Sequence, residues 1–285
     1  MAYHVGVHAL EARAGISPLG RFWLAVGHSL DAHLPYARLH AAGIRRARDK
    51  ASSSDIERSV ADWLRTDLCP AVQSGRLAIS VEGWIRAYNA YNQSGPRVVR
   101  TQAELVSDSG TVPTYVVRRE LLDTKVDPEP CKVSTFAILE VLFNSAAARS
   151  RTGTAGTMLT VSGVARSVGA QHSAAAEVAE VFENRGAVSI PELAKQLGSG
   201  QRTLERKLRS EGGSAETIRL SVRMTRATEL LASALTLTEI AHVTGFSDSA
   251  HMARAFKRAC GIAPSVLKQS IHDGGGTANS RSSIR

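Results

Sequence analysis

The chain has 285 residues and a formal net charge of +9, from 35 Lys and Arg against 26 Asp and Glu. This length accommodates two domains, and three widely spaced cysteines (Cys69, Cys131 and Cys260) argue against the disulfide framework of a small secreted protein. No apolar run approaches the ~18 residues of a membrane span. No basic segment precedes an apolar one at the N-terminus, which disfavours a secretory signal. We therefore expect a cytoplasmic protein with no membrane partner.

Residues 1–92 have the patterns of several helices. Ser17-Pro18 is a helix start signal followed by an apolar run, and residues 80–91 carry apolar side chains at helical spacing. Ser54 with Glu57 predicts a capping box at the start of another helix.

One strand is expected, at Thr111 to Val117. The fold class predicted is mainly α, with an N-terminal domain that is mostly helical and α+β at most. The alternating strands that a sugar-binding barrel needs are not present in this region.

Residues 131–144 form one apolar helix by pattern. Apolar side chains surround most of it, so it belongs either to the core or to a partner surface, and the core is the commoner outcome. The following stretch, 145–157, is small, polar and basic, which is typical of an interdomain linker.

These observations predict four regions along the chain. They are an effector-binding or dimerisation domain (1–150), a linker (151–172), an all-α DNA-binding domain (173–271) and a disordered tail (272–285). From 189 to 271 the sequence has twelve basic and seven acidic residues, and this excess of positive charge suits a polyanionic partner.

A repeated pattern lies inside the last of these domains. Glu192-Leu193-Ala194 and Gly198 recur 47 residues later as Glu239-Ile240-Ala241 and Gly245. Each copy begins with a predicted capping box, opened by Ser189 in the first and by Thr236 in the second. A glycine then ends the first helix of each copy.

Each copy continues with a second helix that has one apolar and one basic face. Gly200 and Asp248 are the expected caps of these helices. A helix, a tight turn and a basic second helix form the geometry that enters a DNA major groove. A helix capped by Ser214 and running to about Ala232 is expected to connect the two units.

The stretch from Ser189 to Lys268 resembles the tandem helix–turn–helix domain of the AraC/XylS family of bacterial transcription regulators. The residues that carry the resemblance are Gly245, Phe246, Asp248, His251, Arg254, Ala255, Phe256, Lys257, Gly261 and Pro264. Met252 replaces the usual Phe, Leu267 replaces an aromatic residue, and Gly200 replaces the usual Ser cap. None of these departures removes a basic group from the second helices.

The resemblance implies which side chains contact DNA. Those at base-reading positions are Arg202, Glu205, Arg206, His251 and Arg254. Those expected at the DNA backbone are Gln201, Lys207, Ser249, Lys257 and Arg258. Arg can pair with guanine O6 and N7, and Glu can accept from cytosine N4, whereas phosphate contacts orient the protein without specifying sequence.

Metal and enzyme chemistry are the alternatives. His4, His8, His28, His33 and His40 have no accompanying Cys, Asp or Glu pattern that completes a ligand set, so we expect no metal site and no cofactor. Sequence motifs for hydrolases, phosphate-binding loops and zinc proteases are absent, and no catalytic residue is assigned.

An inert Cys131 is favoured, because the motif expected around a reactive thiol is absent. Lys132 beside it can nevertheless lower a thiol pKa, which is the setting of reactive cysteines. The alternative function is therefore a DNA-modifying or repair enzyme that uses the helix–turn–helix domain for delivery. The function favoured is a non-enzymatic regulator, acting as an activator on double-stranded promoter DNA. Its expected partners are RNA polymerase, a small-molecule effector and a second copy joined through the N-terminal domain.

Overall fold

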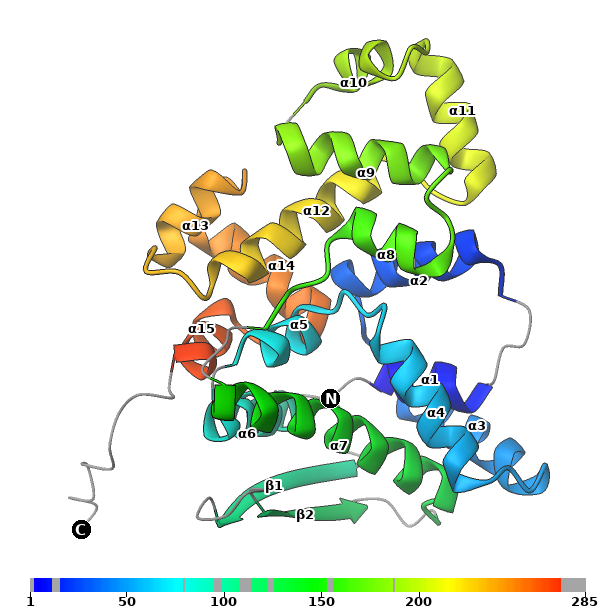
Figure 1. Ribbon diagram of the computed structural model, residues 1–285, viewed down its shortest axis with the longest axis vertical. Helices are drawn as coiled ribbons and strands as arrows, with labels where there is room; N and C mark the ends of the chain where they lie inside the picture. Colours follow the sequence, from blue (N-terminus) through cyan, green and yellow to red (C-terminus); the bar gives the residue numbers. More distant parts are fainter. Residues whose placement is uncertain are drawn as a thin grey trace.

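A computed structural model describes residues 3–11, 16–78, 80–94, 99–107, 114–121, 126–152, 156–186 and 188–272. In these ranges the chain forms fifteen helices and one two-stranded sheet, which confirms the mainly α fold class. The sheet lies at one end of the molecule beneath α6 and α7, and helices α9 to α11 lie at the other end (Figure 1). The expected disordered tail falls outside the described residues, apart from His272 at the end of the last helix.

The first half of the chain is mostly helical, as predicted. Its elements are α1 (Tyr3–Glu11), α2 (Pro18–Leu30), α3 (Tyr36–Arg48), α4 (Ser53–Leu64), α5 (Pro70–Leu77), α6 (Val81–Ser94), β1 (Val99–Ser107), β2 (Thr114–Leu121) and α7 (Glu129–Thr152).

Helix starts in this region follow the sequence signals with one correction. Ser17 caps α2 by accepting a hydrogen bond from the backbone N–H of Gly20. The cap of α4 is Ser52, whose Oγ accepts from the N–H of Asp55. The predicted cap at Ser54 was wrong, because α4 begins two residues earlier and places Ser54 inside its first turn.

The two strands form an antiparallel hairpin that packs on α7. β2 includes the second half of the expected strand, while residues 111–113 of that strand lie outside the described residues. Along β2 exposed and half-buried side chains alternate, and the ring of Tyr115 lies 3.8 Å from that of Phe143 in α7. β1 was not predicted, and it is joined to α6 by two hydrogen bonds between Asn89 and the backbone of Ala103.

Helix α7 is longer than the sequence indicated and is a core helix. It continues through the first half of the expected linker to Thr152, so the prediction of linker structure for 145–152 was wrong. Ala146 and Ala147 are buried, and the Arg149 side chain donates hydrogen bonds to the carbonyl oxygens of Gly75 and Ala78. Among the described helices, α7 has the length and composition of a membrane span, but half of its apolar window is buried inside the protein.

The second half contains helices only, within its described residues. They are α8 (Val161–Val168), α9 (Ala174–Arg185), α10 (Ile190–Gln196), α11 (Gln201–Glu211), α12 (Ala215–Leu230), α13 (Leu237–Val243), α14 (Ser249–Cys260) and α15 (Pro264–His272). Helix α8 lies within the range expected to be a linker and packs on α2 and α9.

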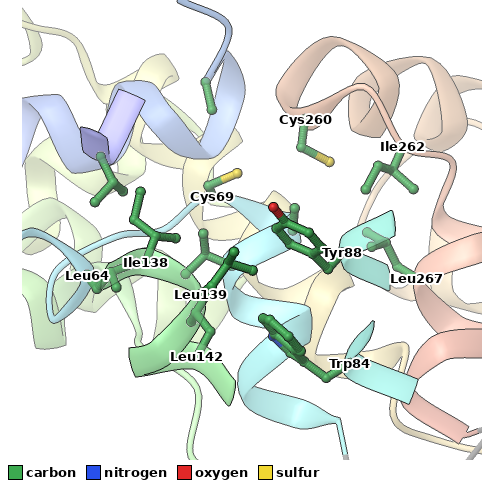
Figure 2. Packing of buried hydrophobic residues seen from close by; sticks show 14 of the residues in the cluster. Leu64, Cys69, Trp84, Tyr88, Ile138, Leu139, Leu142, Cys260, Ile262 and Leu267 are labelled. Carbon is green, nitrogen blue, oxygen red and sulfur yellow. The ribbon is translucent and has the colours of Figure 1, made fainter. Parts of the chain in front are cut away.

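Two apolar cores hold the molecule together, and both include helices from each half of the chain. The larger joins α1, α3 to α7 and the start of the sheet to α13, α14 and α15. Trp84 and Tyr88 of α6 lie between Leu139 of α7 and Leu267 of α15 in this core (Figure 2). The smaller core joins α2 to α8, α9, α10, α11 and the start of α12. The C-terminal helices are therefore packed directly against the N-terminal ones.

Candidate nucleic-acid interface

The first helix–turn–helix unit consists of α10 and α11. Ser189 caps α10 by accepting a hydrogen bond at 3.4 Å from the backbone N–H of Glu192. The helix ends at Gly198, whose φ of +61° is the left-handed conformation that glycine adopts without strain. Gly200 caps α11 with no side-chain hydrogen bond, as its lack of a side chain dictates.

The second unit, α13 and α14, repeats this geometry with more complete caps. Thr236 and Glu239 form the full predicted capping box. Gly245 has a φ of +78°, and Asp248 caps α14 by accepting from the N–H of His251 at 2.6 Å. In both turns the residue after the glycine donates its N–H five residues back, from Ser199 to the Ala194 carbonyl and from Phe246 to the Ala241 carbonyl.

Helix α11 buries one face and exposes a basic one. Leu204 and Leu208 are buried, while Gln201, Arg202, Arg206 and Lys207 are among the exposed residues. Glu205 is half-buried, and its carboxylate accepts from the Gln201 amide at 2.9 Å and lies 3.9 Å from the Arg209 guanidinium. Arg202 and Arg206 make no hydrogen bond or ion pair with another described residue, so both guanidinium groups are available to a ligand.

Helix α14 has the same division between its faces. Met252 and Phe256 are buried, so the Met252 replacement is accommodated within the core. The exposed residues are His251, Arg254, Lys257 and Arg258, and Ser249 is half-buried. Arg254 has no hydrogen-bond or ion-pair partner within the described part of the chain.

One helix connects the two units. Helix α12 has 16 residues, and its cap is the predicted Ser214, which accepts from the N–H of Thr217. At a rise of ~1.5 Å per residue it is ~24 Å long. Its buried Ile218 belongs to the smaller core, and its buried Met224 and Ala227 belong to the larger, so packing along its length fixes it relative to each unit.

Residues 193–270 match a family model described as a helix-turn-helix domain. The C-terminal part of the chain is an AraC-type helix–turn–helix domain. The comparison with curated proteins gives no match. Among solved structures, the chain resembles the crystal structure of the transcriptional regulator CdpR from Pseudomonas aeruginosa, with 20% sequence identity and a TM-score of 0.30. That similarity covers 87% of this chain and 97% of the other, and a score this low carries no argument about function.

In the AraC-type domain, the structure brings together two supporting residues that the sequence did not indicate. Ser247 donates from its backbone N–H to Nδ1 of His251 at 3.5 Å, with its Oγ 3.1 Å from the same nitrogen. Arg223 of α12 lies over the Phe246 ring, which meets the His251 ring edge-on at 5.3 Å.

N-terminal helix α2 and the residues just after it contact the AraC-type domain at three places. The backbone of Gly213, just after α11, lies against the Trp23 ring. Ser29 donates to Ser221 Oγ of α12 at 2.7 Å, and Ala32 donates its N–H to the carbonyl of Ala259 at the end of α14. Helix α2 thus contacts both helix–turn–helix units.

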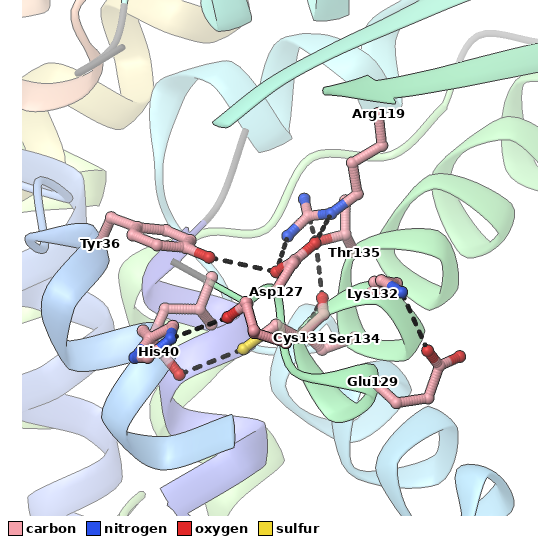
Figure 3. A network of polar contacts seen from close by, with 11 residues as sticks. Tyr36, His40, Arg119, Asp127, Glu129, Cys131, Lys132, Ser134 and Thr135 are labelled. Atoms are coloured by element: carbon pink, nitrogen blue, oxygen red, sulfur yellow. Dashed lines mark hydrogen bonds and ion pairs between the residues drawn. The ribbon is translucent and has the colours of Figure 1, made fainter. Parts of the chain in front are cut away.

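The cysteines do not have the properties of reactive thiols. All three are free and buried, and burial raises the pKa values of Cys131 and Cys260 to about 12. Lys132 pairs with Glu129 at 3.2 Å, so Cys131 has the environment of the inert cysteine that the sequence favoured. Figure 3 shows Cys131 donating to the Leu39 carbonyl beside the buried pair of Arg119 and Asp127.

The Arg119–Asp127 pair belongs to a structural network. Asp127 receives two hydrogen bonds from Arg119, at 2.8 and 3.0 Å, and one from the Tyr36 hydroxyl (Figure 3). Burial and the Asp127 carboxylate raise the Tyr36 pKa, so the hydroxyl remains a donor. The network ties α3, β2 and α7 together, and the nearby His40 ring nitrogen Nε2 lies 3.0 Å from the carbonyl oxygen of Val126.

Three of the five N-terminal histidines do meet in the core. His4 and His8 of α1 approach His28 of α2, and His4 is hydrogen-bonded to Asp67 in the turn between α4 and α5. Burial raises the Asp67 pKa, but the charges of His4 and His28 and the hydrogen bond from His4 outweigh it and hold that pKa at about 2. Burial, with the charge of His4, lowers the His28 pKa well below its usual range.

Proposed function

We propose that this protein is a sequence-specific double-stranded DNA-binding transcription regulator, in which α11 and α14 each enter a major groove. The observation that carries the proposal is that Arg202, Arg206 and Arg254 project from the second helices of two helix–turn–helix units without a hydrogen bond or ion pair to another described residue. Unpaired guanidinium groups on such helices are suited to guanine O6 and N7.

The roles of the ten surface residues follow from their positions. Arg202, Glu205 and Arg206 read bases from α11, and His251 and Arg254 read them from α14. Ser247 contacts Nδ1 of His251, which leaves Nε2 of the ring for a purine base edge. The phosphate contacts assigned are Gln201, Lys207, Ser249, Lys257 and Arg258.

The regulatory part of the proposal is that the protein is a cytoplasmic, non-enzymatic activator. It recruits RNA polymerase, dimerises through its N-terminal region and responds to a small molecule there. Contacts from α2 to both helix–turn–helix units support this response. A ligand that binds differently to two placements of the N-terminal helices shifts the placement of the recognition helices as well. The buried, high-pKa thiols give no support to the alternative of a repair enzyme.

Selection of binding sites by the purified full chain from random duplex DNA tests the proposal. Because α12 is ~24 Å long, addition of half the width of each unit places the recognition helices near ~34 Å apart, about one turn of duplex. The expected product is a motif of two boxes about one turn apart, protected together in a footprint. Inserting ~5 base pairs between the boxes moves one box to the far side of the duplex and abolishes specific binding.

Inserting a full turn does not restore binding by a monomer, because α12 cannot lengthen by another ~34 Å. Recovery of random sequence from the selection would contradict specific recognition. Unimpaired binding after the half-turn insertion would show that one unit alone reads DNA.

A further inference from the structure

Four ionisable side chains are packed together in the N-terminal core. His4, His8 and Asp67 are at most 3% exposed, and His28 is 9% exposed. Nε2 of His4 lies 2.7 Å from Asp67 Oδ2, and Nε2 of His8 lies 3.2 Å from Nε2 of His28. One ligand atom each from His4, His28 and Asp67 all lie within 4.8 Å of one another.

If this cluster had only a structural role, it would lower the stability of the fold. Buried polar groups that lack hydrogen bonds destabilise a fold, and a buried carboxylate needs compensating charge. Nδ1 of His4 is buried and has no hydrogen-bond partner. Close apolar neighbours such as Val5 and Ala25 show that hydrophobic side chains are accommodated at the same place. A ligand that binds imidazole and carboxylate together would offset the free-energy cost of burying this cluster.

The space beside the cluster has the size of a single small species. A cavity of about 10 Å³ is lined by His28 and Asp67, roughly the room that one water-sized occupant requires. Arg21 also lines it, but its guanidinium is paired with the Asp62 carboxylate and stacked on Trp63. No uncompensated positive charge from Arg21 therefore opposes a cation here.

We propose that His4, His28 and Asp67, with His8 as the fourth ligand, bind a divalent transition-metal ion of the zinc type. Zinc is held at ~2.0–2.2 Å by imidazole nitrogen and carboxylate oxygen, which places tetrahedral ligand atoms about 3.3 Å apart. The contacts of 2.7 and 3.2 Å are close to that spacing. The ligand atoms of His4, His28 and Asp67 lie within 4.8 Å of one another, so the side chains must draw together around the ion.

The composition of the cluster selects the class of ion. Imidazole with one carboxylate and no thiolate suits Zn²⁺, Co²⁺ and Ni²⁺, and does not suit Mg²⁺ or Ca²⁺, which require mostly oxygen ligands. The ion joins α1, α2 and the turn between α4 and α5. This assignment differs from the expectation of no metal site, and it does not depend on the proposed DNA-binding function.

Metal titration of the full chain, prepared without a histidine tag and stripped with a chelator, tests the site. We expect one equivalent of Zn²⁺ to bind in competition with a chromophoric chelator. We also expect one equivalent of Co²⁺ to give the visible absorption bands of four-coordinate nitrogen and oxygen ligation, and Zn²⁺ to displace it. His28→Ala and His4→Gln should each weaken binding by more than ~100-fold, since each removes a ligand.

His33→Ala is the matched control, because His33 follows α2 closely, is exposed and lies outside the cluster. It should bind metal as the unaltered chain does. A second measurement needs no variant of the core and therefore does not depend on whether such a variant folds. It records the imidazole ¹⁵N chemical shifts of the unaltered chain before and after Zn²⁺ is added. The ¹⁵N signals of three imidazole rings should then shift. Substitution of the exposed histidines one at a time should assign their signals, and none of the three shifted signals should be among them. Absence of stoichiometric binding, retention of binding in His28→Ala, or shifts confined to exposed histidines would overturn the proposal.

Discussion

At the level of individual residues, the arginines and lysines of the recognition helices carry the same charge but are expected to contact different parts of the DNA. We predict that Arg206→Ala and Arg254→Ala each cost ~1–3 kcal/mol of binding and relax base preference in one box only. Lys257→Ala should weaken binding to all sequences about equally and reduce its salt dependence, because a phosphate contact carries no base information. Affinities for the selected site and for single-base variants, measured at several salt concentrations, give both quantities.

A matched control for these substitutions is Arg166→Ala. Arg166 lies on α8, outside the helix–turn–helix units, and pairs with Glu180 at 3.1 Å. Its removal changes the net charge of the protein by the same amount and should leave base preference unchanged. Equal, sequence-independent losses for Arg206, Arg254 and Lys257 would refute the base-reading assignment.

Two glycines give a residue-level test of the packing of α2. A Cβ at Gly213 would lie under 3.0 Å from three Trp23 ring atoms, whereas a Cβ at Gly27 within α2 has no neighbour within 4 Å. Gly213→Ala should therefore destabilise the chain by ~1–3 kcal/mol through overpacking. Gly27→Ala should stabilise it by ~0.5–1 kcal/mol, because alanine loses less backbone entropy in a helix.

Denaturant unfolding of both variants measures these changes in free energy. Adding Trp23→Leu to Gly213→Ala should recover part of the loss, since the smaller side chain leaves room for the methyl group. Stabilisation by Gly213→Ala would contradict the contact between α2 and the turn after α11.

At the level of single elements, α11 has a cap that can be improved. Gly200 has the extended backbone of a cap (φ −77°, ψ 148°) but no side chain to accept a hydrogen bond. Gly200→Ser should stabilise the chain by a few tenths of a kcal/mol, the difference between glycine and serine at this position. Thermal unfolding checks this, with Gly200→Ala as the variant that adds a side chain without an acceptor. A higher melting temperature for the Ala variant than for the Ser variant would contradict the capping argument.

Local signals explain which elements could be predicted from the sequence. Ser17, Ser214 and Asp248 cap the helices that they were expected to start, because a cap acts within three residues of itself. The unpredicted β1 buries Thr101 and Ala103 on its inner face, and such small or polar side chains give a weak alternating pattern.

The parts of the candidate sites that depend on contacts between distant segments could not be predicted from the sequence. The recognition faces of α11 and α14 were predictable because each lies on one helix. The support of His251 by Arg223 through Phe246 depends on where α12 crosses the second unit. Asp67 reaches His4 from 63 residues away, so no spacing rule in the sequence indicates that cluster.

At the level of the whole molecule, α2 and the residues just after it lie between the two recognition helices and contact the end of each. Trp23 supports the end of α11, and Ala32 is hydrogen-bonded to the end of α14. Between them Ser29 is hydrogen-bonded to Ser221, near the middle of α12. Two contacts along α2 and one just beyond its C-terminal end restrict the distance and rotation between the two units.

We therefore predict that Trp23→Ala broadens the tolerance for box spacing and leaves base preference within each box unchanged. Two extra base pairs between the boxes move the second box by ~7 Å and ~70°. In the unaltered chain this insertion should reduce affinity at least tenfold, a cost of ~1.4 kcal/mol. In Trp23→Ala the reduction should be several-fold smaller, because the end of α11 is no longer held.

Affinities for native and lengthened sites, measured well below the melting temperature of each variant, provide the test. Gly27→Ala is the control, since it alters α2 at a position whose added methyl group meets no neighbour. It should show the spacing dependence of the unaltered chain. If Trp23→Ala keeps the full penalty for the lengthened site, then α12 alone sets the distance between the recognition helices and α2 has no part in it.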